Sequence, residues 1–165
     1  MASRKLRSSL LVAAALMLAA ASLSAGQKPL KSRDFAVAGV KPSMSQQRVQ
    51  RELGPPQAVE QIQHPTVPEY LYTRWNYPDL QVTFAPDGQL TGIMLRTQTH
   101  ATRRGLRVGD SRDRVLELYG APHSLGSPAW DYLESREPSG QHLIRVEFVD
   151  DRVASIYLGW LAIDG

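Results

Sequence analysis

Ser111 is the residue whose setting most resembles a catalytic one. In Gly109-Asp110-Ser111, a hydroxyl exposed at a tight turn would need only a nearby base and oxyanion donors to act as a nucleophile. Ser45 occupies the corresponding position in a similar stretch elsewhere in the chain, where Met44 stands in the place of Asp110. A shared role as a helix N-cap explains both serines, so we predict no catalytic residue. A Ser-dependent hydrolase is kept as an alternative.

The sequence gives little support for metal or acid-base chemistry. The histidines show neither His-x-His nor His-x3-His spacing, and the chain has no Cys to accompany them. Asp150 and Asp151 follow a predicted strand, so we interpret them as the solvated tip of a hairpin and not as an acid-base pair. We therefore predict no metal ligand and no cofactor. The histidines are His64, His100, His123 and His142.

The elements that position these residues occur twice. Residues 39–56 match residues 105–122 without a gap, at a constant offset of 66 residues. Further along, Trp75-Asn76-Tyr77 corresponds to Trp130-Asp131-Tyr132. A fixed offset over a block of this length indicates duplication, so we predict two copies of one small unit.

Each copy predicts one short helix followed by three strands. Ser45 and Ser111 lie at N-cap positions, and Gly54 and Gly120 suit the left-handed position after the last helical residue. A Pro two residues after each Gly prevents the helix from continuing. Runs rich in β-branched and aromatic residues then indicate strands. The expected strands are residues 69–77, 81–85 and 90–96 in the first copy and 129–133, 142–149 and 152–158 in the second.

The predicted fold class is α+β, with two tandem repeats that each pack a short helical segment on a three-stranded antiparallel meander. Repeat 1 spans residues 26–96, repeat 2 spans residues 105–165, and a polar linker of residues 97–104 connects them. Alternation along the strands predicts one inward face in each sheet. Its members are Trp75, Tyr77, Val82, Phe84, Ile93 and Leu95, with Trp130, Tyr132, Val146, Phe148, Ile156 and Leu158 as their counterparts.

Two motifs carry a resemblance to a known family. They are Gly39-x5-Ser45-x3-Val49-x4-Gly54-x-Pro56 and Gly105-x3-Gly109-Asp110-Ser111-x3-Val115-x4-Gly120-x-Pro122. With the aromatic-rich meander they resemble the SmpA/BamE-like fold, which is known from an accessory lipoprotein of outer-membrane protein assembly and, in tandem, from the beta-lactamase inhibitory protein. The resemblance implies a protein-binding domain that acts outside the cytoplasm. The chain departs from the lipoprotein in having two repeats and no Cys to acylate.

The first 25 residues have the order of a bacterial secretory signal. Basic residues at positions 4, 5 and 7 precede an apolar stretch of about a dozen residues, shorter than the roughly 20 that span a bilayer, and Ala25 is the expected last residue removed. A retained anchor is the competing interpretation. The chain has 19 Lys and Arg, and subtracting these three leaves 16, which equals the 16 Asp and Glu. The mature protein is thus close to neutral, which argues against nucleic acid as a partner. We expect a periplasmic or secreted protein with no membrane span after cleavage.

The opposite strand parity defines the candidate binding surface. We predict that a protein partner in the envelope or extracellular space contacts this outer sheet face and the hairpin of residues 134–141, although the same residues could simply pave an ordinary half-exposed sheet. The favoured function is a non-enzymatic protein-binding module; the alternatives are an inhibitor of a secreted or periplasmic enzyme and a small-molecule carrier. The predicted partner-binding residues are Tyr70, Tyr72, Arg74, Met94, Arg145 and Tyr157. Gln81, Thr83, Arg96, Asp131, Leu133 and Glu147 share their face.

Overall fold

A computed structural model describes residues 26–64, 67–125, 128–134 and 142–160. The predicted signal segment, its cleavage site and most of the hairpin of residues 134–141 lie outside the described residues. Within the described ranges, no helix has the length and apolar character required to cross a bilayer.

Both predicted helices are confirmed, each with its serine cap. Helix α2 spans Gln46–Leu53 and helix α3 spans Arg112–Tyr119, and a short 3-10 helix, η2, spans Ser32–Phe35. The Oγ of Ser45 accepts a hydrogen bond from the Arg48 N–H at 3.4 Å, and the Oγ of Ser111 accepts from the Arg114 N–H at 3.2 Å. These bonds satisfy a backbone donor that the first helical turn leaves without an intrahelical partner.

The glycines that end the helices adopt a different conformation from the one expected. Gly54 has φ 78° and ψ −170°, and Gly120 has φ 75° and ψ −157°. The positive φ requires Gly, but the ψ values are extended and not left-handed helical, because the chain turns directly toward the next strand. Each Gly N–H still donates to the carbonyl four residues earlier, on Gln50 and Leu116.

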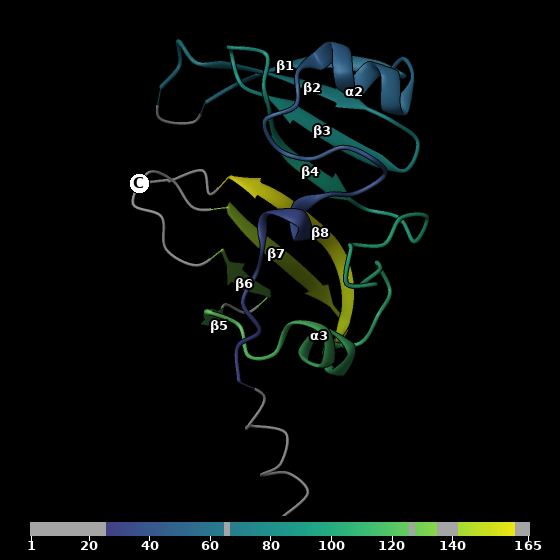
Figure 1. Ribbon diagram of the computed structural model, residues 1–165, viewed down its shortest axis with the longest axis vertical. Helices are drawn as coiled ribbons and strands as arrows, with labels where there is room; N and C mark the ends of the chain where they lie inside the picture. The colour runs from purple at the N-terminus through teal and green to yellow at the C-terminus, as the bar shows by residue number, and fades with distance from the viewer. Residues whose placement is uncertain (1–25, 65–66, 126–127, 135–141, 161–165) are drawn as a thin grey trace, which may run out of the picture.

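The strands form one antiparallel sheet in the order β1-β2-β3-β4-β8-β7-β6-β5 (Figure 1). The central pair is β4 and β8, with Met94 opposite Tyr157 and Leu95 opposite Ile156. The strands are β1 (Ala58–Gln63), β2 (Leu71–Asn76), β3 (Leu80–Phe84), β4 (Leu90–Leu95), β5 (Ser124–Leu125), β6 (Ala129–Leu133), β7 (His142–Val149) and β8 (Arg152–Trp160).

The predicted fold class, two repeats that each place a helical segment on three strands, is wrong. Each half supplies four strands, because β1 and β5 were not expected, and the β4–β8 pairing fuses both halves into a single sheet. The molecule is mostly sheet, with α2 and α3 of eight residues each as its α-helices in the described part. β1 escaped notice because its sequence, Ala-Val-Glu-Gln-Ile-Gln, is half polar and does not alternate regularly between apolar and polar residues, and β5 has only two residues.

The inward face of the sheet is confirmed as the core. The two predicted sets join in one cluster, in which Phe84 packs on Trp75 and Phe148 packs on Trp130, with ring centroids 4.7 and 4.8 Å apart. Tyr77 differs, since it follows β2 and is only half-buried, and its hydroxyl donates to the carbonyl of Gly54. The core therefore continues across the β4–β8 junction.

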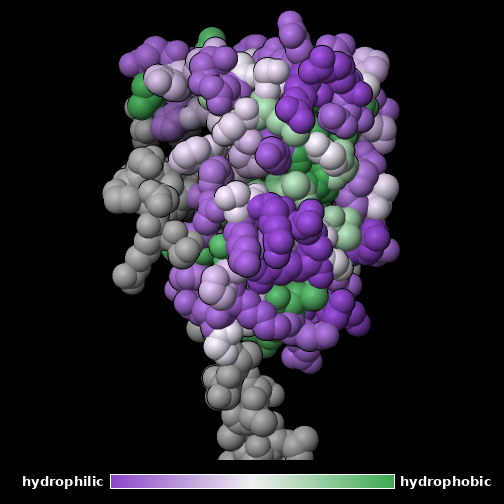
Figure 2. Space-filling view, viewed as in Figure 1, coloured by the Kyte–Doolittle hydropathy of each residue, from purple (hydrophilic) through white to green (hydrophobic). Residues whose placement is uncertain are grey.

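The segment before α2 crosses both halves of the molecule. Near α3, the Lys28 N–H donates to the Tyr119 carbonyl, and Leu30 bridges to Glu134. Further along, Ser43 and Met44 exchange backbone hydrogen bonds with Leu90 at the start of β4. This segment lies on the same side of the sheet as α2 and α3 (Figure 1). That side is paved mainly by hydrophilic residues, with small apolar patches between them (Figure 2).

Candidate interaction face

The sheet face opposite the helices, here called the outer face, carries most of the predicted binding residues. The register aligns Gln81, Met94, Tyr157, Arg145 and Asp131 in one row across five strands, β3, β4, β8, β7 and β6. Alternate burial along β3 and β7 separates this row from the core. Met94, Tyr157 and Arg145 are therefore neighbours in space although they come from three different strands.

Tyr157 lies at the centre of the outer face, and its side chain packs over Gly92 and Gly159, here called the glycine floor. Gly92 and Gly159 are paired across β4 and β8, and a Cβ on either would come within 3 Å of the Tyr157 side chain. The Tyr157 hydroxyl donates to the Trp160 carbonyl at 3.0 Å. Burial, reinforced by the nearby Tyr72, raises the pKa of Tyr157 to about 12. The ring is thus a fixed, neutral platform at the junction of the two halves.

Aromatic side chains gather where β1 and β2 meet. The rings of Tyr70 and Tyr72 are 6.5 Å apart, and those of Tyr72 and His64 are 5.9 Å apart. Tyr70 was expected within a strand, but it precedes β2 and is 50% exposed. Phenolic rings that combine apolar area with a hydroxyl are suited to contact with another protein.

Polar side chains between these groups are held in place by one another. The Nδ2 of Asn76 donates to Oε1 of Glu60, and the Nε2 of Gln81 donates to Oδ1 of Asn76, both at 2.8 Å. Arg74 lies 3.9 Å from the Glu60 carboxylate. On β6 and β7, Asp131 accepts two hydrogen bonds from Arg145, at 2.8 and 2.9 Å. Groups fixed before binding lose less conformational entropy when a partner arrives.

The structure thus brings together some predicted residues and separates others. Met94, Arg145 and Tyr157 share one row, Tyr72 and Arg74 follow on β2, and Tyr70 lies at the margin. Sequence reasoning missed the two glycines under Tyr157, although an isolated Gly inside a strand is a known signal of close approach. It also missed Asn76, whose amide links Glu60 and Gln81 and gave no sequence signal.

The residues considered for catalysis have structural roles. Ser111 caps α3, and Asp150 and Asp151, at φ 48° and 59°, form the exposed turn between β7 and β8, as the hairpin interpretation predicted. His142 pairs with Glu134 at 2.8 Å through Nδ1, but no described hydroxyl lies within hydrogen-bond distance of its Nε2. In the described part of the chain, no three His, Asp or Glu side chains are grouped closely enough to hold a metal ion.

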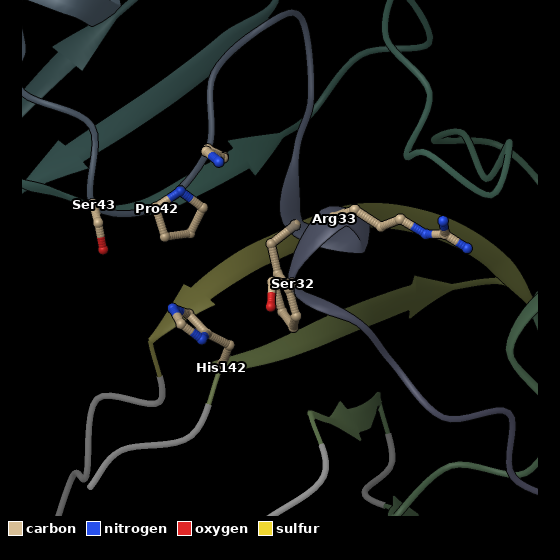
Figure 3. Close-up of a pocket in the computed structure, with 7 residues that line it drawn as sticks. Ser32, Arg33, Pro42, Ser43 and His142 are labelled. Carbon is tan, nitrogen blue, oxygen red and sulfur yellow. The ribbon is translucent and has the colours of Figure 1, made fainter. Parts of the chain in front are cut away.

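A pocket of about 270 Å³ lies between the N-terminal segment and the start of β7 (Figure 3). Ser43 faces His142 across it, whereas Arg33 extends away from His142. The His142 ring packs at a tilt against the rings of Trp160 and Phe35, with centroids 4.3 and 5.1 Å apart. Its Nε2 is buried, so this ring acts as packing for the N-terminal segment more than as a ligand-binding group. The lining residues are Ser32, Arg33, Phe35, Lys41, Pro42, Ser43 and His142.

Comparison with protein-family models, with curated protein sequences and with solved structures finds no match to this chain.

Proposed function

We propose that this protein is an exported, non-enzymatic binding module of the cell envelope or secreted space, and that it holds a protein partner on its outer face. The observation that carries the proposal is the row of Met94, Tyr157, Arg145 and Asp131, which presents aromatic, thioether and guanidinium groups side by side. These side-chain types are enriched at protein interfaces. The described helices and the N-terminal segment pack on the opposite side of the sheet (Figure 1). In the row itself Arg145 is exposed, and Met94, Asp131 and Tyr157 are half-buried.

The order of residues 1–25 supports export, and the near-neutral remainder of the chain supports a protein partner over a polyanion. The resemblance of the two Gly-x-Pro motifs to the SmpA/BamE-like family is in keeping with the same setting. A hydrolase finds less support, because the Ser111 hydroxyl is engaged as a helix cap and the Nε2 of His142 has no hydroxyl to activate among the described residues.

Site-specific photocrosslinking in the producing cells tests this proposal. A crosslinking amino acid at Met94 probes the outer face, and one at Gln47, exposed on α2, serves as the control. We expect one discrete protein adduct from Met94 and none from Gln47. Adducts of the same pattern from both positions, or from neither, contradict the proposed face.

The captured partner then allows a quantitative comparison of two arginines. Arg145→Ala removes a side chain from the central row, whereas Arg48→Ala removes an exposed arginine from α2. Calorimetry with the purified partner should show at least tenfold weaker binding for Arg145→Ala, about 1.4 kcal/mol, because truncation of a central interface residue costs more than 1 kcal/mol. Arg48→Ala should bind as the parent protein does, and equal losses from both variants would point to a general charge effect.

A further inference from the structure

Strand β1 is an open edge of the sheet. It has six residues, and five of them are exposed. The opposite edge, β5, has only two residues. An edge strand presents a row of backbone donors and acceptors that can pair with another strand, and β1 has the usual length of a strand within a sheet.

The backbone groups that point away from the sheet can be assigned by residue. His64 donates from its N–H to the Tyr70 carbonyl at 2.9 Å, and the β1–β2 register continues with Ile62 opposite Tyr72. Because alternate residues of an antiparallel strand bond to the same neighbour, the even-numbered residues of β1 bond to β2. Val59, Gln61 and Gln63 therefore direct their N–H and C=O groups toward the free side.

β1 lacks the features that usually protect an edge. It contains no Pro, Gly or Lys, and its register with β2 is regular, whereas the β3–β4 and β7–β8 pairs contain irregularities. Its one charged residue, Glu60, is engaged by Asn76 and Arg74 within the same molecule. Natural proteins protect edges with charges, Pro or bulges. The single charge of β1 is engaged within the molecule, so this edge remains open to pairing with another strand.

Exposed apolar side chains concentrate beside this edge. Four large hydrophobic residues are exposed in the described part of the chain, and three of them lie on β1, at the start of β2 or directly before it. These are Val59, Tyr70 and Leu71, at 56%, 50% and 45% exposure. Val59 lies opposite Trp75 at one end of the β1–β2 pair, and Leu71 lies opposite Gln63 at the other end, so exposed apolar side chains occur near both ends of the edge. A contact along β1 would bury them and pair the free backbone groups at the same time.

We propose that β1 pairs antiparallel with β1 of a second copy of this chain, about a two-fold axis that passes through Gln61. Gln61 then faces Gln61 of the second copy, Val59 faces Gln63, and Glu60 faces Ile62. All three outward-directed residues fall in hydrogen-bonded pairs, and Val59 comes into the same cross-strand row as Gln63 and Leu71 of the second copy.

The sequence of β1 selects this register over its neighbours. Moving one copy by two residues in one direction places the two Glu60 carboxylates opposite each other, which is destabilising. Moving it in the other direction leaves only residues 61–63 overlapping. Because β5 is too short to receive β1, the pairing closes as a two-fold dimer and does not continue as an open chain.

Because the sequence contains no Cys, single Cys substitutions can report the register of the proposed β1–β1 pairing through disulfide formation. In a Gln61→Cys variant the two sulfurs meet at the axis, where Cα atoms of a hydrogen-bonded pair lie about 5.5 Å apart, a distance that a disulfide spans. In a Val59→Cys variant the two positions are four residues apart along the strands, about 13 Å, which is too far. Under mild oxidation we expect rapid covalent dimerisation of Gln61→Cys and at least tenfold slower reaction of Val59→Cys.

A third variant tests the pairing without new chemistry. Gln61→Pro removes an N–H that points away from β2, so the fold should remain, as circular dichroism can verify, while self-association in analytical ultracentrifugation weakens at least tenfold. The proposal is overturned if the parent protein stays monomeric at its highest soluble concentration. It is overturned in the same way if the protein stays monomeric and β1 pairs instead with a strand of another protein. Equal oxidation rates for the two Cys variants would also overturn it. Since the contact uses the backbone of β1, its outcome is independent of partner binding at the Met94 row.

Discussion

At the scale of single residues, Arg104 connects three parts of the chain. Its guanidinium donates to Oδ2 of Asp34 at 2.8 Å and to the Pro29 carbonyl at 2.6 Å, and it lies 5.0 Å from the centre of the Tyr119 ring. The side chains of Arg104 and Asp34 are 18% and 7% exposed. Burial alone would raise the pKa of Asp34, but hydrogen bonds from Arg104 and the Lys31 N–H, with the nearby charge, lower it overall.

We expect Arg104→Ala to destabilise the protein by about 3 kcal/mol at neutral pH, because it leaves a buried carboxylate without its partner. The pKa of Asp34 is lowered in the folded state, so its contribution is complete above the unfolded value of about 3.9 and is lost as the pH falls through the folded value. Urea denaturation at pH 7 and at successively lower pH measures both effects. The cost of Arg104→Ala should shrink with acidification, and a cost independent of pH would show that packing on Tyr119 dominates.

At the scale of elements, the two helix caps invite a matched comparison. Ser45→Ala and Ser111→Ala should each lower the free energy of unfolding by about 1 kcal/mol, since each removes the acceptor for an N3 backbone N–H. Asp at either position should restore most of the loss, because its carboxylate caps as well as a hydroxyl does. Equilibrium denaturation of the four variants checks this, and a much larger loss at Ser111 alone would indicate a role beyond capping.

The parts of the fold that follow from local chemistry were predictable from the sequence, and those that follow from pairing were not. The capping roles of Ser45 and Ser111 were predictable because a helix cap depends on a few neighbouring residues. β6 and β7 were predicted with the bounds that the structure shows. β1 is an edge strand that pairs with β2 alone and is mostly exposed, so its mixed polar and apolar sequence carried no strong strand pattern. The candidate face was predictable in its side-chain parity, but its alignment across β4 and β8 depends on tertiary pairing.

At the scale of the whole molecule, the glycine floor under Tyr157 sets how closely the two halves meet. A Cβ on Gly92 would lie 2.6 Å from the Tyr157 ring, and a Cβ on Gly159 would collide with the Thr91 carbonyl and lie 2.7 Å from the Gly92 Cα. The first obstacle is a side chain and the second is backbone. The two glycines should therefore respond differently to the same substitution.

We expect Gly92→Ala and Gly159→Ala each to destabilise the protein, by about 1–3 kcal/mol, through overpacking. In a Tyr157→Ala background the cost of Gly92→Ala should largely disappear, while the cost of Gly159→Ala should persist. A double-mutant cycle by thermal denaturation measures the two couplings. Equal coupling of both glycines to Tyr157 would contradict the geometry of the floor.

One continuous sheet and one core predict that the two halves unfold together. Two variants that both carry Trp160→Phe, one retaining only Trp75 and the other only Trp130, report on the first and the second half by fluorescence. Both should give the same denaturant midpoint. Far-UV circular dichroism should follow the same curve. Two separated transitions would show that the β4–β8 junction joins halves that are stable alone.

The place of β8 in the sheet also constrains the order in which the molecule can form. β8 follows every other described strand in the chain, yet it lies between β4 and β7. Until it arrives, β4 has a bare inner edge, and Leu95 and Ile156 must close a long loop before they gain each other's contact. Pairing over such a separation slows folding and leaves the earlier half exposed to aggregation. We therefore expect refolding to be limited by insertion of this last strand. The first half would then form a transient intermediate that aggregates with other copies of itself unless it is protected.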